Sequence, residues 1–225
     1  ESETEETYVD VVDGVQIDCG LTSTNFVTNT EKHTCELDNP LIFTCSSEIP
    51  NVRKIQNILE HVIKSNRSLL IVAPVAQSVK AALMMNKVKG NIKVNIIDPP
   101  GFGPTKKDAI DDLAILTGAT VLNEELGDDL DLMKPEHLGE AEFAVTSDKD
   151  TVLTLEGMTE GIEGRIDELN KKLAEEKNGF IKKKLEQRLA TLSGSVGIIK
   201  VGAGSKVELK EKKDRVEDAI YATKA

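Results

Sequence analysis

The stretch Ser68-Leu-Leu-Ile-Val-Ala-Pro74 organises the rest of this chain. It is a short apolar run between turn residues, which is typical of a strand buried on both faces of a sheet. Residues before it recur at helical spacing and predict a helix with one apolar stripe, formed by Val52, Ile55, Leu59, Val62 and Ile63. Residues 50–86 are therefore predicted to form a helix, a buried strand and a second helix.

The second predicted helix carries apolar residues on both of its sides. Val79, Ala82 and Leu83 fall on one side at 100° per residue. The other side is formed largely by Lys80, Ala81, Met84 and Met85. Two interpretations of the methionines remain open, because Met often fills irregular gaps in a core and an exposed apolar patch often binds a partner.

Composition narrows the class of protein. With 30% charged and 39% hydrophobic residues and a net charge of −11, the chain is predicted to be globular and to repel a nucleic-acid backbone. No apolar run reaches membrane-spanning length. Cys19, Cys35 and Cys45 show no CxxC spacing, so we expect buried or half-buried thiols in a reducing, cytoplasmic compartment. The three histidines are too scattered to predict a metal site.

The chain around the central stretch is predicted to alternate strands and helices. Strands are expected at 7–12, 15–19, 41–44, 93–97, 120–123, 142–145, 151–155 and 196–201, with a turn at Asp13-Gly14. Helices are expected at 105–117, capped by Thr105, at 159–192 as a hairpin broken by Asn178-Gly179, and at 207–225. Buried, parallel-type strands with short links favour an α/β layer fold flanked by antiparallel strands.

The segment Gly101-Phe-Gly103 follows a predicted strand and precedes a predicted helix, where a phosphate-binding loop would lie. It matches neither glycine-rich phosphate pattern. Three prolines at 99, 100 and 104 also remove backbone N–H donors from the loop. These observations favour a binding module over an enzyme.

Several motifs match one family in order and spacing. They are Asp13-Gly-Val-Gln-Ile-Asp-Cys-Gly20, Ser68-Leu-Leu-Ile-Val-Ala73, Pro100-Gly-Phe-Gly103, Asp112-Leu-Ala-Ile-Leu-Thr-Gly118, Lys184-Leu-Glu-Gln-Arg-Leu189 and the run from Val207 to Ala219. Over essentially its whole length the chain resembles the apical domain, with flanking intermediate-domain segments, of the group I chaperonins, the GroEL family.

The resemblance implies a domain organisation. Residues 13–196 would be the apical, polypeptide-binding domain with the chaperonin apical-domain fold. Residues 1–12 and 197–225 would be two segments of a small α+β intermediate domain. By the same resemblance the equatorial ATP-binding domain would be absent, so we expect the chain to be a piece of a longer protein, monomeric by itself.

The resemblance also implies a binding groove for non-native polypeptides and for the mobile loop of a GroES-type co-chaperonin. Its residues would be Gln56 and Leu59 on the first helix, Lys80, Met84 and Met85 on the second, and Leu21, Ser23, Asn25 and Phe26 on an extended segment. We expect Leu59, Met84, Met85 and Phe26 to be partly exposed along this groove. From the residues alone, Phe26 could instead pin its loop to the core.

The sequence departs from the family in the groove and at one contact between subunits. Gln56 and Lys80 stand where leucines are usual, and Asn25 replaces an aromatic residue. Cys19 and Lys206 replace an Arg and a Glu that pair between subunits. These changes suggest a divergent member, and they leave open an assembly-only or moonlighting paralogue.

The resemblance gives Asp218 a catalytic role only in the parent chain. There it would help to activate the water that attacks ATP, with Mg²⁺ as the metal, in a homo-oligomeric ring that hydrolyses ATP. The piece itself is expected to hold no cofactor. A small-ligand α/β enzyme with its site at 99–103 is a further alternative.

Overall fold

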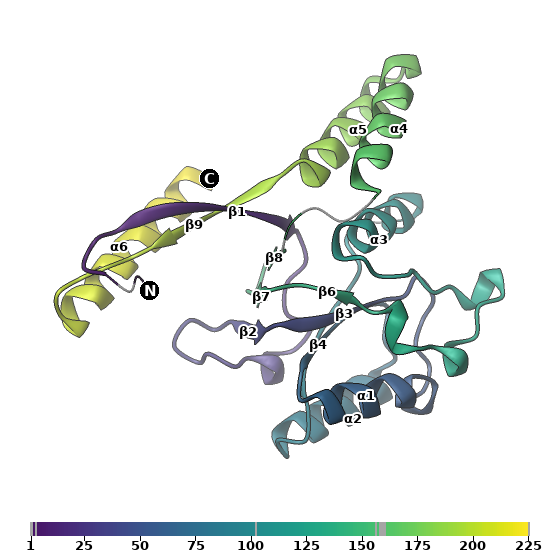
Figure 1. Cartoon of the computed structure of the whole chain (residues 1–225), viewed down its shortest axis with the longest axis horizontal. Helices are drawn as coiled ribbons and strands as arrows, with labels where there is room; N and C mark the ends of the chain where they lie inside the picture. The colour runs from purple at the N-terminus through teal and green to yellow at the C-terminus, as the bar shows by residue number, and fades with distance from the viewer. Residues whose placement is uncertain (1, 3, 102, 156, 158–160, 225) are drawn as a thin grey trace. The chain divides into compact units, whose positions relative to one another are not determined.

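The computed structural model describes residues 2, 4–101, 103–155, 157 and 161–224 (Figure 1). Within these residues the chain is a mixed α/β protein with two sheets and six α-helices. It divides into two compact units. The larger comprises Asp13–Gly194, and the smaller comprises Glu1–Val12 and Ser195–Ala225.

The first sheet of the larger unit has the strand order β5-β4-β3-β6. Strands β3 (Pro40–Thr44), β4 (Ser68–Val72) and β5 (Lys93–Ile97) are parallel, and β6 (Gly139–Glu140) runs antiparallel to β3. All five residues of β4 are buried. The prediction of a strand covered on both faces is therefore confirmed.

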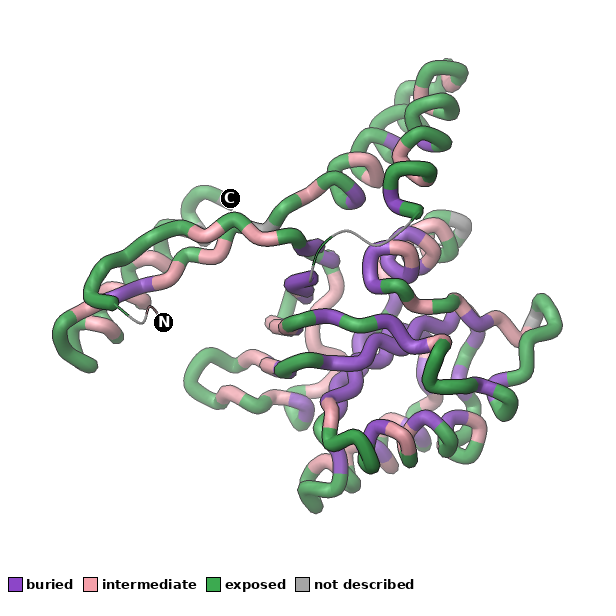
Figure 2. Tube along the Cα trace, in the orientation of Figure 1, coloured by how far each residue is buried: buried purple, intermediate pink, exposed green. Residues whose placement is uncertain are grey.

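Alternate residues of these strands point to opposite faces of the sheet. Leu69 and Ile71 of β4 belong to one core cluster, together with the inner faces of α1 (Gln56–Ser65) and α2 (Gln77–Val88). Leu70 and Val72 belong to the other cluster, which includes residues of α3 (Pro104–Thr117). The sheet is thus the middle layer of the larger unit, and Figure 2 shows buried residues concentrated on its strands.

The second sheet has the order β2-β7-β8-β1-β9. In the larger unit, β2 (Cys35–Asp38), β7 (Phe143–Thr146), β8 (Thr151–Thr154) and the last residues of β1 (Tyr8–Ile17) pair antiparallel. The buried amide of Asn95 in β5 donates a hydrogen bond to Thr146 Oγ1 in β7, at 2.9 Å. This bond ties the two sheets together.

A helical hairpin, α4 (Ile162–Glu175) and α5 (Gly179–Leu192), completes the larger unit. Its apolar side chains join the α3 side of the core through Ile162, Leu169, Leu185 and Leu192. The buried carboxylate of Asp112 on α3 accepts hydrogen bonds from Arg165 Nε (3.1 Å) on α4 and Arg188 Nε (2.6 Å) on α5. One α3 carboxylate thus holds both helices of the hairpin.

The smaller unit contains the first half of β1, β9 (Ser195–Lys200) and α6 (Lys206–Lys224). Lys200 pairs with Asp10 at 3.7 Å. Gly202 is required here because a Cβ atom would lie 2.3 Å from the carbonyl oxygen of Thr4. Across the described residues, none of the helices has the length and apolar character needed to cross a membrane.

Three local predictions are wrong. The Asp13-Gly14 pair does not form a turn, because β1 continues through it and Gly14 pairs with Thr154 of β8. Residues 120–123 form only an isolated bridge, Cys45 with Leu122. The N-cap of α3 is Gly103 and no side chain caps the helix, so Thr105 lies inside it.

Other predictions hold or fall outside the described residues. The three cysteines are free thiols, with Cys35 and Cys45 buried and Cys19 half-buried, as predicted. Burial raises the pKa of the Cys35 thiol to about 11, which keeps it protonated at neutral pH. Phe102, Thr159 and Ala225, which belong to the predicted loop, hairpin and last helix, lie outside the described residues.

Candidate functional site

The outer side of α1 and of the short 3-10 turn before it, Val52–Ile55, carries a mixed stripe. Ile58 and Val62 are buried and attach α1 to the sheet. Leu59 is half-buried, whereas Ile63 is 51% exposed. Ile63 lies at the exposed edge of the predicted apolar stripe, because it is 140° around the helix from Ile58 at 100° per residue.

Helix α2 exposes a stronger apolar stripe. Val79 and Leu83 are buried against the sheet. On the outer side Met85 is 61% exposed and Val88 77% exposed, and Met84 between the two sides is half-buried. The core contacts of α2 are complete without Met85 and Val88, so these two side chains contribute little to holding the helix in place.

Polar residues interrupt both apolar stripes, and they form a hydrogen bond or an ion pair with neighbouring residues. Gln56 Nε2 donates to Glu60 Oε1 at 2.9 Å along α1. Lys80 Nζ forms an ion pair with Asp98 at 3.6 Å, and its side chain is mostly buried. Neither group extends an unpaired charge over the apolar side chains.

The segment from Leu21 to Val27 includes a 3-10 turn, Thr24–Phe26, capped by Ser23, whose hydroxyl accepts a hydrogen bond from Asn25 N. Thr22 Oγ1 donates to the carbonyl of Ile96 at 2.9 Å, which fixes the segment beside β5. Asn25 is exposed and Leu21 half-buried. Phe26 is 0% exposed and lies in the core under α2. The expected exposure of Phe26 is therefore wrong, because its ring pins the segment to the core.

Lys87 on α2 locks this segment in place. Its ammonium group donates to the carbonyl oxygens of Asn25 at 2.9 Å and Val27 at 3.1 Å, and lies 5.7 Å from the centre of the Phe26 ring. Burial lowers the pKa of the Lys87 ammonium group. This role of Lys87 could not be predicted from the sequence, since nothing in the helical pattern signals that a lysine reaches two carbonyl groups far away in the sequence.

The structure brings some of the predicted site residues together. Leu21, Leu59 and Met84 are half-buried and pack on the same core cluster that contains Phe26. Gln56, Asn25 and Met85 lie at the surface, and Ser23 caps the segment. Ile63 and Val88 are exposed apolar residues that the predicted set lacks. Helical spacing could have found both, because Ile63 lies seven residues after Gln56 and Val88 lies seven residues after Ala81, on the same side of each helix.

The glycine-containing loop before α3 was the alternative site for a small ligand. Gly101 and Gly103 have positive φ angles, 88° and 57°, that favour glycine. Pro104 occupies the first turn of α3, and so one of the first N–H groups of this helix is missing. No group of three or more His, Cys, Asp or Glu side chains suited to a metal ion occurs among the residues that the structure describes.

Asp218 lies on α6 in the smaller unit and is exposed. Lys206 is the first residue of the same helix and is also exposed. Burial raises the pKa of the Cys19 thiol in the larger unit, with Asp98 and Asp18 adding to the effect.

A search against models of known protein families finds no match for this chain. The exposed side of α1 and α2 must therefore be interpreted from its own chemistry. It offers flexible thioether and aliphatic side chains on two helices whose backbones are fixed by a buried sheet. Such a surface can bind apolar side chains of a partner without demanding a particular sequence.

Proposed function

We propose that the larger unit is a polypeptide-binding domain of the kind found in group I chaperonins, with the apical-domain fold of that family. The observation that carries the proposal is the exposure of Ile63, Met85 and Val88 on two helices whose opposite sides complete the core. We call this outer side of α1 and α2, formed by Gln56, Leu59, Ile63, Met84, Met85 and Val88, the apolar face. The matching order of motifs along the chain supports the same family.

The ligands would be non-native polypeptides and the mobile loop of a co-chaperonin. An unfolded chain presents apolar side chains in no fixed order, and methionine adapts to different shapes because it is unbranched and polarizable. Each apolar side chain buried fully in such a complex would contribute about 1.5–3 kcal/mol. A few contacts of this kind bind weakly, and several copies in a ring would raise the overall affinity through avidity.

The segment with Asn25 and Phe26 would act as a fixed wall beside the apolar face. Phe26 would contribute by holding the wall in the core, and Asn25 and Leu21 would supply the surface. The polar residues Gln56 and Lys80 would narrow the range of apolar ligands.

The proposal for the parent chain is broader. It would form a homo-oligomeric ring in the cytoplasm, bind ATP and Mg²⁺ in an equatorial domain, and use Asp218 of α6 in ATP hydrolysis. Nothing in the described residues of this chain is assigned to nucleotide binding.

The test is to replace Met84 and Met85 by Glu in the full chain. An apolar ligand that covered the two new carboxylates would have to strip water from them, so the double variant should lose at least about tenfold in affinity for a permanently unfolded, carboxymethylated protein. Two single variants are controls, Lys64→Glu on α1 and Lys89→Glu at the C-terminal cap of α2. Both positions are exposed, and each variant makes the chain more negative by the same amount as the double variant does. Equal binding by the double variant and the parent chain would refute the proposal, provided circular dichroism shows both folded.

A further inference from the structure

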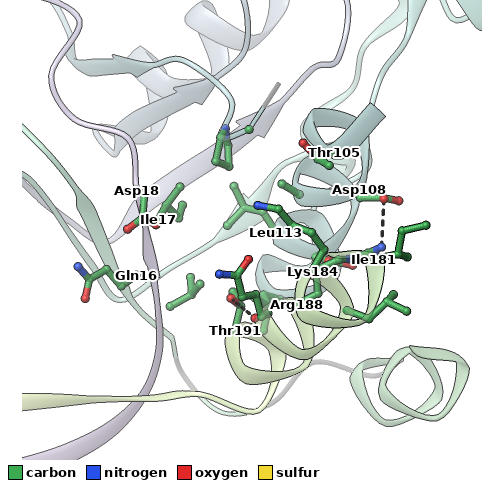
Figure 3. A pocket seen from close by; sticks show the side chains of 18 of the residues that line it. Gln16, Ile17, Asp18, Thr105, Asp108, Leu113, Ile181, Lys184, Arg188 and Thr191 are labelled. Atoms are coloured by element: carbon green, nitrogen blue, oxygen red, sulfur yellow. Dashed lines mark hydrogen bonds and ion pairs between the residues drawn. The ribbon is translucent and has the colours of Figure 1, made fainter. Parts of the chain in front are cut away.

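A cavity of about 410 Å³ lies between α3, α5 and the end of β1, on the side of the sheet opposite α1 and α2 (Figure 3). Its volume falls in the range of small-molecule sites, about 300–1,000 Å³. The proposed polypeptide-binding face uses none of its residues. The cavity therefore needs an explanation of its own.

Apolar atoms form most of its wall. Ile17, Leu113, Leu116 and Leu185 line it and are buried. At the start of α5, Phe180 and Ile181 also line the cavity although they are 71% and 42% exposed. A ligand that covered these two exposed apolar side chains would remove their surface from water, which would favour binding.

The buried charges of the cavity are already neutralised. Arg188 on α5 binds Asp112 through Nε at 2.6 Å and Asp108 through Nη1 at 3.1 Å. A cationic ligand could reach these carboxylates only by displacing the guanidinium group. They therefore do not favour a cation.

Lys184 is the cationic group of the lining that a ligand could use. Its side chain extends from α5 across the cavity, as Figure 3 shows, and its ammonium group lies 6.0 Å from the centre of the Phe180 ring. The neighbouring Lys182 and Lys183 make this part of α5 positive within an acidic chain. Asp18 lines the β1 side of the cavity, away from Lys184 in the same view, so the cavity has a positive and a negative side.

We infer that this cavity binds a single-chain carboxylate amphiphile of the fatty-acid type. The hydrocarbon chain lies among Leu113, Leu116 and Leu185, and Phe180 and Ile181 cover it at the mouth. The carboxylate accepts a charge-assisted hydrogen bond from the Lys184 ammonium group, on the side away from Asp18.

The test titrates the full chain by calorimetry with three amphiphiles of equal chain length, below their micelle concentrations. They are decanoate, decyltrimethylammonium and decyl maltoside. Decanoate should bind at one site and at least about tenfold more tightly than the cation, as expected for one hydrogen bond to a charged group. Equal affinity for all three would overturn the inference, since it would leave only non-specific apolar binding.

Two variants locate the site. Lys184→Glu should weaken decanoate binding by about tenfold or more, whereas Lys183→Glu, on an exposed position outside the cavity, should change it little. Equal effects of the two would show general attraction to α5 and contradict the site. The Met84→Glu and Met85→Glu double variant should bind decanoate like the parent chain, and a loss there would place the amphiphile on the apolar face instead. These outcomes are independent of whether the apolar face binds polypeptides.

Discussion

The helix pair α1–α2 and the helix pair α4–α5 are both amphipathic, yet they are attached to the larger unit in opposite ways. Helices α1 and α2 pack on the buried strands through apolar side chains, and they keep apolar side chains at the surface as well. The hairpin α4–α5 has a surface dominated by charged residues and is tied to α3 by ion pairs around the buried Asp112. Figure 2 shows the hairpin exposed along most of its length.

The two helix pairs therefore differ in which substitutions they tolerate. On α1 and α2 the exposed apolar residues are not needed for the core, so they are available for binding and replaceable without loss of the fold. On the hairpin a single buried carboxylate binds two guanidinium groups, so its removal takes the closest partner from both of them. Substitution of the exposed apolar residues on α1 and α2 should therefore change binding but not stability, whereas substitution of the carboxylate at the hairpin should lower stability.

The largest expected effect is on the hairpin. Asp112→Ala leaves Arg165 and Arg188, both largely buried, without their shared partner. We expect a loss of about 3–5 kcal/mol in the free energy of unfolding of the larger unit, as for other broken buried ion pairs. Urea unfolding followed by circular dichroism measures it.

Asp108→Ala is the control, because Asp108 binds Arg188 from a half-exposed position. It should cost no more than about 1 kcal/mol. If both variants lose the same small amount, the apolar contacts of Leu169 and Leu185 hold the hairpin, and the contrast between the two helix pairs disappears.

A smaller effect is expected beside the apolar face. Lys87→Met removes the donor to the carbonyls of Asn25 and Val27 but preserves an apolar contact with Phe26. Because water can reach part of this segment, the cost in stability should be about 1 kcal/mol. Hydrogen exchange of the amides at 25–28 should speed up.

Lys89→Met, on an exposed residue at the end of the same helix, should leave that exchange unchanged. Unchanged exchange in Lys87→Met itself would mean that Phe26 and Thr22 alone hold the segment.

Much of the layer order could be predicted from the sequence. The apolar run at β4 and the helical periods on both sides of it indicate the middle layer, because burial on two faces leaves no room for alternation. The path of β1 could not be predicted, because Asp13-Gly14 has turn chemistry and only pairing with β8 overrides it. Local propensity yields to tertiary pairing at such positions.

The candidate site was predictable in part. The helical period places Met85 outside, and the structure confirms this. For Phe26, the residues alone left open the core position that the structure shows. Lys87 was not predictable, because its role depends on a contact between segments about sixty residues apart. Which residues of the apolar stripe at 52–63 are exposed could not be predicted, because the stripe is wide enough to contain both buried and exposed residues such as Ile63.

The most direct test compares the two helix pairs as ligand-binding surfaces. A photo-crosslinking residue, p-benzoylphenylalanine, replaces Met85 on α2 or Phe180 on α5 in the full chain, and a permanently unfolded, carboxymethylated protein is added before irradiation. Both positions are exposed and apolar, so they are matched in reactivity. We predict strong crosslinks from position 85 and few from position 180. Equal yields at the two positions, or crosslinks from position 180 alone, would contradict the proposal that the α1–α2 surface binds non-native polypeptides.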